Sequence, residues 1–285
     1  MHVVAAANPA SAETPKGYAR RSRGFRKISY ADRRSGSVHM GVSVCSLDAD
    51  GFIAPHLHSF EESFFVLEGE LLVRIGERSA HLIPGDYGLI STGTTHAWKS
   101  ASPHPARWLE MQAPQPRDPD HGRDTFFVAG DPPPQGEPVD DSTFPGGRLG
   151  HFSEADLPRP GAPSEMEGFN PVTGVAIKMF VDRSRGAIHQ SLFLIQYLPG
   201  ASIDLHDHTF EESYYIISGE VEATADGQIH HLGPGSTIWT GVGCLHAFAN
   251  RSAEPVRWIE TQAPLPPAQE VFRFERDWAD HADPL

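Results

Sequence analysis

The chain has 285 residues, of which 39% are hydrophobic and 21% charged, and this composition is typical of a globular protein with two domains of ordinary size. A net charge of −14 argues against a general nucleic-acid or anionic-membrane binder, and no apolar run is long enough to span a bilayer. We expect no secretory signal, because the N-terminal residues lack an apolar region of useful length followed by a cleavage site, and the two cysteines do not occupy equivalent positions in the two halves of the chain. We therefore expect a cytoplasmic protein without a structural disulfide.

Residues 1–27 are rich in Ala, Pro, Ser and Arg, and we expect a mobile or loosely docked arm, with its basic cluster at 20–27 solvated. From Val38 to Val44, apolar residues alternate with other residues, which predicts a strand with one buried face. Short Gly and Pro turns separate the strands that follow, and this rhythm is typical of an antiparallel barrel or sandwich. These further strands are expected at 62–67, 71–75, 87–90, 96–99 and 107–112.

Residues 116–174 are rich in proline, which favours extended and poorly paired backbone, so we interpret them as a connector. Alternation resumes in 175–285, most clearly over 188–197, and the tail at 271–276 suits a closing strand or a short helix. The sequence thus predicts an all-β protein with an arm (1–27), a first antiparallel barrel (28–115), a connector (116–174) and a second barrel with a tail (175–285).

A His-x-His pair stands in the second half of the chain. His206 and His208 leave the same face of a β-strand because they are two residues apart. Glu212 follows on a returning strand, and His246 comes after a later Gly/Pro turn. Three imidazoles and one carboxylate that converge from neighbouring strands can bind a divalent metal.

The same layout occurs 150 residues earlier, together with its surrounding glycines, prolines and tryptophans, which indicates an internal duplication. We therefore predict eight metal ligands, namely His56, His58, Glu62 and His96 in the first half and His206, His208, Glu212 and His246 in the second.

Both halves resemble the cupin superfamily in two glycine-bounded motifs. The second half matches the first motif through Gly200, His206, His208, Glu212 and Gly219, and the second motif through Gly235, Gly243, His246 and Asn250. In the second half Gly241 stands where the family prefers Pro. The first half matches through His56, His58, Glu62, Gly69, Gly85, Gly93 and His96, but it has one residue fewer before His56 and has Ser91 and Ser100 where the family prefers Pro and Asn. The chain as a whole resembles a bicupin, which implies two tandem jelly-roll barrels.

Three neutral imidazoles and one carboxylate leave a bound divalent ion with a net charge of +1 and, in octahedral geometry, with two open positions. We expect up to two such ions per chain, with Mn or Fe favoured and Ni, Co or Zn as alternatives. Glu62 and Glu212 are candidate general bases as well as ligands. Their neighbours Glu61 and Glu211 are expected to point away from the metal.

The resemblance implies a metal-dependent enzyme acting on a small organic molecule, most simply an oxygen-dependent oxidoreductase of the dioxygenase type. A non-redox isomerase, lyase or hydrolase and a non-catalytic ligand-binding bicupin are the alternatives. Within the resemblance, the absence of a Ser-Glu-Asn lid motif disfavours oxalate decarboxylase, and the glutamates argue mildly against a three-histidine gentisate-type site. Phe64, Trp98, Tyr214 and Phe248 are expected to wall the pockets or to fill the barrel cores. The expected partners are a small substrate and O2, with no nucleic acid and no membrane, and the chain is expected to be a monomer or a homodimer.

Overall fold

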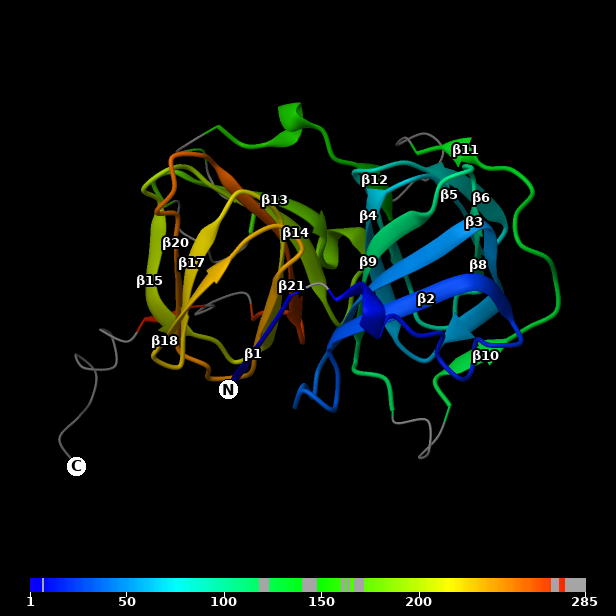
Figure 1. Ribbon diagram of the computed structural model, residues 1–285, viewed down its shortest axis with the longest axis horizontal. Helices are drawn as coiled ribbons and strands as arrows, with labels where there is room; N and C mark the ends of the chain where they lie inside the picture. Colours follow the sequence, from blue (N-terminus) through cyan, green and yellow to red (C-terminus); the bar gives the residue numbers. More distant parts are fainter. Residues whose placement is uncertain are drawn as a thin grey trace. The chain divides into compact units, whose positions relative to one another are not determined.

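The computed structural model of the chain (Figure 1) describes residues 1–6, 8–117, 123–139, 148–159, 162, 165–166, 172–267 and 272–274. The chain divides into two compact units. One unit comprises Asn8–Ser153 and Val181–Gln190, and the other comprises Met1–Ala7, Glu154–Phe180 and Ser191–Leu285. Each unit thus includes a short segment from the other half of the sequence.

The unit built from the first half is a single curled sheet of eleven strands. Its strands follow the order β11-β6-β5-β8-β3-β9-β4-β7-β12, and β2 and β10 also pair with the long strand β3. Apart from the parallel pair β11–β6, the pairs with described registers are antiparallel. The strands are β2 (Ser22–Ala31), β3 (Gly41–His58), β4 (Glu61–Glu68), β5 (Leu71–Ile75), β6 (Arg78–Leu82), β7 (Asp86–Ile90), β8 (His96–Ser100), β9 (Ala106–Ala113), β10 (Thr125–Phe127), β11 (Glu137–Pro138) and β12 (Leu149–His151).

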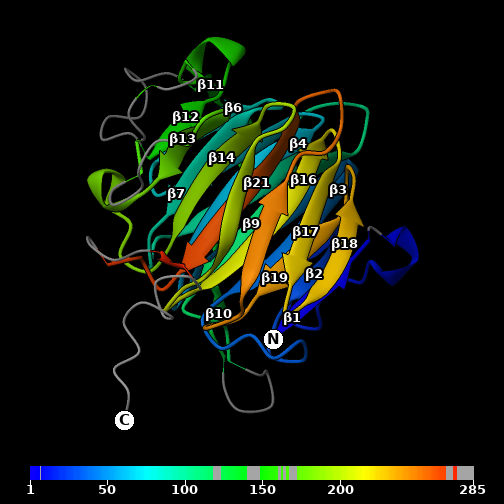
Figure 2. The ribbon, with the colours of Figure 1, turned by 90° about the vertical axis from the view of Figure 1, so that its left-hand side faces the viewer.

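The unit built from the second half has two sheets. Figure 2 shows the six-stranded sheet, in the order β1-β19-β16-β21-β14-β13, and the five-stranded sheet has the order β18-β17-β20-β15-β22. The strands are β1 (His2–Ala5), β13 (Val175–Val181), β14 (Ser191–Tyr197), β15 (Ser202–Asp207), β16 (Glu211–Ser218), β17 (Val221–Ala225), β18 (Gln228–Leu232), β19 (Thr237–Thr240), β20 (His246–Ala249), β21 (Val256–Ala263) and β22 (Arg273–Phe274). The predicted fold class, two antiparallel β-barrels of the jelly-roll kind, is confirmed.

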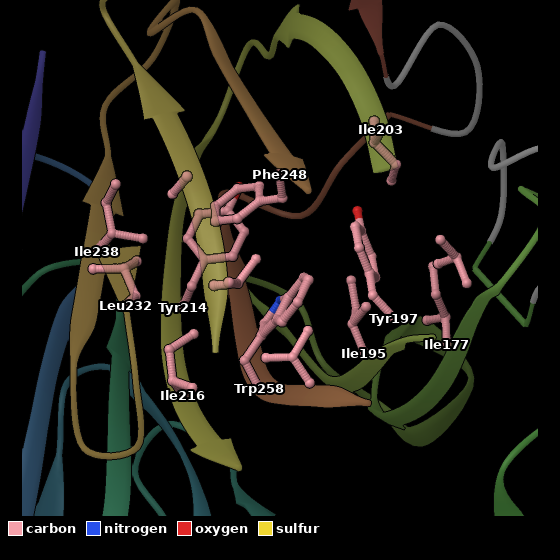
Figure 3. Close-up of a cluster of buried hydrophobic side chains, with 14 of the residues drawn as sticks. Ile177, Ile195, Tyr197, Ile203, Tyr214, Ile216, Leu232, Ile238, Phe248 and Trp258 are labelled. Carbon is pink, nitrogen blue, oxygen red and sulfur yellow. The ribbon is translucent and has the colours of Figure 1, made fainter. Parts of the chain in front are cut away.

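Alternate residues of these strands point inward and form the core of the second unit (Figure 3). Tyr214, Phe248 and Trp258 pack together there, with ring centroids 4.5 Å apart for Tyr214 and Phe248 and 5.5 Å apart for Phe248 and Trp258. Trp98 and Trp108 stack in the same way in the first unit, with centroids 5.1 Å apart. Because these aromatic side chains fill the interiors, each barrel has a packed wall on which a site can be held rigidly.

Several sequence-based expectations differ from the structure. The segment interpreted as an arm contains β1 and most of β2, because Val3 pairs with Trp239 and the buried Phe25 pairs with Leu47. The predicted strand at Val38 begins only at Gly41, and Val38 itself is exposed. The connector carries three short strands, β10 to β12.

The tail forms β22, a strand rather than a helix, because Arg273 pairs with Asp207 and Phe274 with His206. Its other predicted positions, Val271, Glu275 and Arg276, lie outside the described residues. Among the residues that the structure describes, no helix is long and apolar enough to cross a bilayer. Cys45 and Cys244 are both free and buried.

Candidate metal centres

The first centre lies where β3, β8 and β4 meet. His56 on β3 is paired directly with His96 on β8, after a register shift between Ile53 and His56. Such a shift re-aims the side chains that follow it. His56, His58 and His96, here called the first triad, are buried and offer ring nitrogens within 4.8 Å of one another. Three imidazoles at this spacing could hold a metal ion.

Backbone carbonyls select the tautomer of these histidines. Nδ1 of His56 lies 2.8 Å from the carbonyl oxygen of Ala54, and Nδ1 of His96 lies 3.0 Å from that of Thr94. A carbonyl oxygen can only accept a hydrogen bond, so each Nδ1 carries the proton and each Nε2 keeps its lone pair. This arrangement is the usual one for a histidine that binds a metal through Nε2.

The carboxylate of Glu62 faces the same space. Its Oε2 atom is 3.0 Å from Nε2 of His58 and 3.7 Å from Nε2 of His96. Neither contact has hydrogen-bond geometry, and among the described residues these two nitrogens and Oε1 of Glu62 have no hydrogen-bond partner. Buried polar atoms normally have partners, so a cluster of orphaned atoms aimed at one point fits a cation.

The protonation states also suit a cation. Burial lowers the pKa of His56 well below its ordinary value, and the neighbouring His96 and His58 lower it further. Burial alone would raise the pKa of Glu62, but the facing His58 and His96 more than offset this and hold the pKa well below its usual range. Neutral imidazoles and an ionised carboxylate are the forms that bind a divalent metal.

The second centre repeats this geometry on β15, β20 and β16. His206 pairs with His246 after the equivalent register shift, and their Nδ1 atoms lie 2.6 Å from the Asp204 carbonyl and 2.8 Å from the Cys244 carbonyl. The buried residues His206, His208 and His246 form the second triad, again with ring nitrogens within 4.8 Å. Burial, followed by the proximity of His246 and His208, lowers the pKa of His206 to about 3.

Glu212 faces the second triad, with Oε2 at 3.2 Å from Nε2 of His208 and 3.0 Å from Nε2 of His246. Its pKa is well below the usual range because the two histidines outweigh the opposing effect of burial. The structure thus brings together all four predicted residues of each set. By contrast, Glu61 is directed elsewhere, as expected, because its carboxylate accepts hydrogen bonds from the backbone N–H groups of Ile188 and His189.

A phenol distinguishes the second centre from the first. Tyr214 on β16 occupies the position of Phe64 on β4, and its hydroxyl donates to Oε2 of Glu212 and lies 3.0 Å from Nε2 of His246. Gln262 donates to Oε1 of the same Glu212 at 2.9 Å. In the first centre the equivalent Gln112 donates to Glu110 instead, at 2.5 Å. Glu212 is therefore held on both oxygens.

The two centres also differ around a second glutamate, which is Glu110 in the first unit and Glu260 in the second. In the first unit the ammonium of Lys27 lies 2.6 Å from Glu110, which also accepts from the thiol of Cys45 at 3.2 Å. In the second unit the position of Lys27 is taken by Ile177, and Glu260 accepts a hydrogen bond of 2.9 Å from the indole N–H of Trp258. Burial, followed by the charge of Glu212, raises the pKa of Glu260 well above its usual value. This shift favours the protonated form of Glu260.

A small cavity of about 20 Å³ adjoins the second triad, which is room for about one water molecule. Polar groups of His206, Glu212, Tyr214 and Glu260 line it together with apolar side chains. Phe272 covers it next to β22, with its ring centroid 5.0 Å from that of His206. These aromatic and aliphatic walls exclude bulk water from the carboxyl groups.

Sequence reasoning missed three of these features. Tyr214 was expected only as a wall residue, although its alternation with Glu212 on one strand face could have placed its hydroxyl beside the carboxylate. Lys27 was interpreted as part of a solvated basic cluster, but it is buried beside Glu110. The raised pKa of Glu260 could not be foreseen, because it depends on which side chains face this carboxyl group across the barrel.

Comparisons with known proteins agree with this description. A sequence model of the cupin domain matches the chain twice, at residues 43–112 and 193–261. The chain therefore contains two cupin domains, and its resemblance to the bicupins is confirmed. A comparison with curated protein sequences gives no significant match.

The chain also resembles solved structures of other proteins. An oxalate decarboxylase from Lactobacillus farciminis, in complex with formate, has a TM-score of 0.64 and 16% identity, over 93% of this chain and 89% of that one. A putative glyoxylate-induced protein from Pseudomonas aeruginosa has a TM-score of 0.66 and 15% identity, over 92% and 88%. A variant of salicylate 1,2-dioxygenase from Pseudoaminobacter salicylatoxidans, in complex with gentisate, has a TM-score of 0.65 and 14% identity, over 84% and 74%. At these identities the likeness establishes the fold.

Proposed function

We propose that the chain is a metal-dependent enzyme that transforms a small organic substrate, with its reaction centre at the second triad, and that the reaction is an oxygen-dependent oxidation of the dioxygenase type. The observation that carries the proposal is the convergence of three Nε2 atoms and the Glu212 carboxylate beside a cavity that Tyr214 and Glu260 also line. Buried polar groups that converge on a cavity are the usual signature of an active site.

The residues proposed to hold the metal are the second triad with Glu212 and, at the first centre, the first triad with Glu62. A divalent metal bound there would supply Lewis-acid activation of a chelated substrate oxygen and, if it is redox-active, electron transfer. The Asp204 and Cys244 carbonyls keep His206 and His246 in the tautomer that presents Nε2. Gln262 orients the carboxylate of Glu212.

The other polar groups suit proton transfer. Glu212, and Glu62 at the first centre, are proposed as general bases that take a proton from a substrate hydroxyl. The hydroxyl of Tyr214 can donate to a substrate oxygen in place of Oε2 of Glu212, because it already points into the cavity. Phe272 and the other walls keep water away from these groups. A substrate larger than one water molecule requires Phe272 to move, since the cavity itself is small.

A second candidate is a non-redox lyase. The observation in its favour is the pair of buried carboxyl groups, Glu212 and Glu260, joined through Gln262, whose amide donates to one at 2.9 Å and the other at 3.5 Å. Such a pair can remove a proton and return it without any electron leaving the substrate. The similarity in fold to oxalate decarboxylases makes a carboxylic acid a reasonable substrate class for this candidate.

The first experiment is elemental analysis of protein purified without a histidine tag or added metal. Wild type, His56→Ala and His206→Ala are compared, and we expect about two equivalents of Mn or Fe in wild type and one fewer in each variant. Metal-free wild-type protein would overturn the proposal. Zinc alone would remove the oxidative reaction and leave the lyase, isomerase or hydrolase alternatives.

The second experiment screens catechols, hydroxybenzoates, β-diketones and dicarboxylic acids with an oxygen electrode and with product detection by mass spectrometry. Turnover that consumes O2 supports the dioxygenase, and turnover without O2 consumption supports the lyase. His206→Ala is expected to abolish either activity and His56→Ala to retain it. The opposite pattern would move the reaction centre to the first triad.

A further inference from the structure

A third group of metal-ligating side chains lies in the second unit, outside both triads. It consists of His2, Asp226 and Cys244, which offer a ring nitrogen, a carboxylate oxygen and a thiol sulfur within 4.8 Å of one another. We propose that these three side chains form a separate divalent metal site, suited to zinc. The proposal is independent of the function assigned to the second triad.

Three different elements bring the ligands together. His2 lies on β1 and pairs with Thr240 on β19. Asp226 lies in the two-residue turn between β17 and β18 with φ of 46°, a left-handed conformation that Asp adopts more readily than most residues. Cys244 lies in the loop between β19 and β20. The turn and the loop are joined by a hydrogen bond of 2.8 Å from the backbone N–H of Asp226 to the Leu245 carbonyl.

The orientation of the His2 ring suits a ligand. Its Nδ1 atom faces Asp226, 3.2 Å from Oδ2, and its Nε2 atom lies 2.9 Å from Nε2 of His230 on β18. If Nε2 carries the proton and donates to His230, Nδ1 keeps its lone pair for a metal. A histidine ligand whose other nitrogen is held by a neighbouring polar group is the common arrangement at metal sites.

The donor set indicates zinc among divalent metals. Thiolate, imidazole and carboxylate are the three kinds of ligand that zinc accepts, and thiolate disfavours magnesium and calcium. One thiolate and one carboxylate neutralise a divalent ion, so the loaded site has no net charge. Three protein ligands leave the fourth tetrahedral position to a water molecule. The side chain of Asp226 is 35% exposed, and an ion can enter from its side.

This cluster is not a product of the duplication. The positions equivalent to Asp226, Cys244 and His230 in the first half are Gly76, Thr94 and Ala80, none of which binds metals well. The alternative is that Asp226 only fastens β1 to the barrel, since it also lies 2.9 Å from the Met1 amino group and 3.2 Å from Nδ1 of His2. A metal would have to displace the Met1 amino group. The experiment must therefore detect the thiolate bond itself.

Cobalt(II) provides that signal, because a bound thiolate gives a charge-transfer absorption in the near ultraviolet that imidazole and carboxylate ligands do not give. Untagged metal-free protein is titrated with cobalt past saturation of the two triads. We expect a thiolate band in wild type and in Cys45→Ala, and no band in Cys244→Ser or Asp226→Asn. His230→Ala is expected to weaken cobalt binding at this band about 10–100-fold. His231→Ala, at the exposed neighbouring histidine, is the matched control and should change nothing.

A second measurement observes Cys244 in the wild-type protein, with Asp226→Asn as its control. Zinc is expected to slow alkylation of Cys244 by iodoacetamide in wild type that already contains manganese in both triads, and to have no such effect in Asp226→Asn. Peptide mass spectrometry identifies the alkylated cysteine. A wild-type protein without a thiolate band, or a band that survives in the His2→Ala, Asp226→Asn double variant, would overturn the proposal. Neither result would bear on the function proposed for the second triad, because these variants leave its ligands unchanged.

Discussion

Replacement of Tyr214 by phenylalanine tests whether the phenol holds the metal ligands in the metal-free protein. The change removes only the hydroxyl, and phenylalanine already occupies the equivalent position, Phe64, in the first unit. That hydroxyl donates to Oε2 of Glu212 and lies 3.0 Å from Nε2 of His246. Both Oε2 of Glu212 and Nε2 of His246 are atoms proposed to bind the metal, so these contacts and metal binding compete.

The magnitude follows from the charge on Glu212. A hydrogen bond to a charged group contributes about 1.5–3 kcal/mol to stability. We expect Tyr214→Phe to lower the free energy of unfolding of the metal-free protein by about this amount. If the metal displaces the hydroxyl, removing the hydroxyl does not change the stability of the metal-loaded protein. The metal affinity of the second centre in Tyr214→Phe then rises by about 10- to 150-fold.

The assay combines urea unfolding of metal-free protein with calorimetric titration of Mn²⁺. Both are carried out in a His56→Ala background, so that only the second centre is observed. The affinity of the first centre, measured in a His206→Ala background, is the control and should not change. A fall in affinity at the second centre, in proportion to the loss of stability, would refute this reasoning, because the hydroxyl would then support Glu212 in the loaded state as well.

Three other predictions concern the supports of the two centres. Lys27→Met is expected to lower the free energy of unfolding, measured in urea, by about 3–5 kcal/mol because it leaves the charge of Glu110 buried and unpaired. Adding Glu110→Gln to the same chain should restore much of this stability. Glu61→Ala should lower the free energy of unfolding by about 1–3 kcal/mol for each of the two backbone N–H groups that it leaves without an acceptor, and Glu61→Gln should lower it less. Equal losses in the two variants would contradict the assigned hydrogen bonds. His206 titrates near pH 3 when folded and near pH 6.5 when unfolded, so the unfolded state binds more protons between these values and stability rises with pH. In the metal-free protein, the free energy of unfolding should therefore rise less steeply with pH in His206→Asn than in wild type, by about 1.4 kcal/mol per pH unit across this range. An unchanged slope would show that His206 is charged in the folded protein.

The sequence by itself determined the fold class and the two sets of four residues. Both depend on local periodicity and on an offset of 150 residues, which can be read without knowing any distance. Residues two apart on a strand share a face, so His206 and His208 had to point the same way. The glycine-bounded motifs then supplied the turn that returns Glu212 to them.

Only the tertiary structure decided how the two centres differ. Lys27 pairs with Glu110, and Ile177 stands in its place near Glu260, because β2 and β13 lie against particular neighbours in their own sheets. The cluster of His2, Asp226 and Cys244 depends on β1 pairing with β19, more than two hundred residues away in the chain. Pairing of this kind is set by the burial of whole strand faces, and side-chain protonation then follows from what each barrel places opposite a carboxylate. Neither the strand pairing nor the protonation of a side chain can be predicted from the residues that are its neighbours in the sequence.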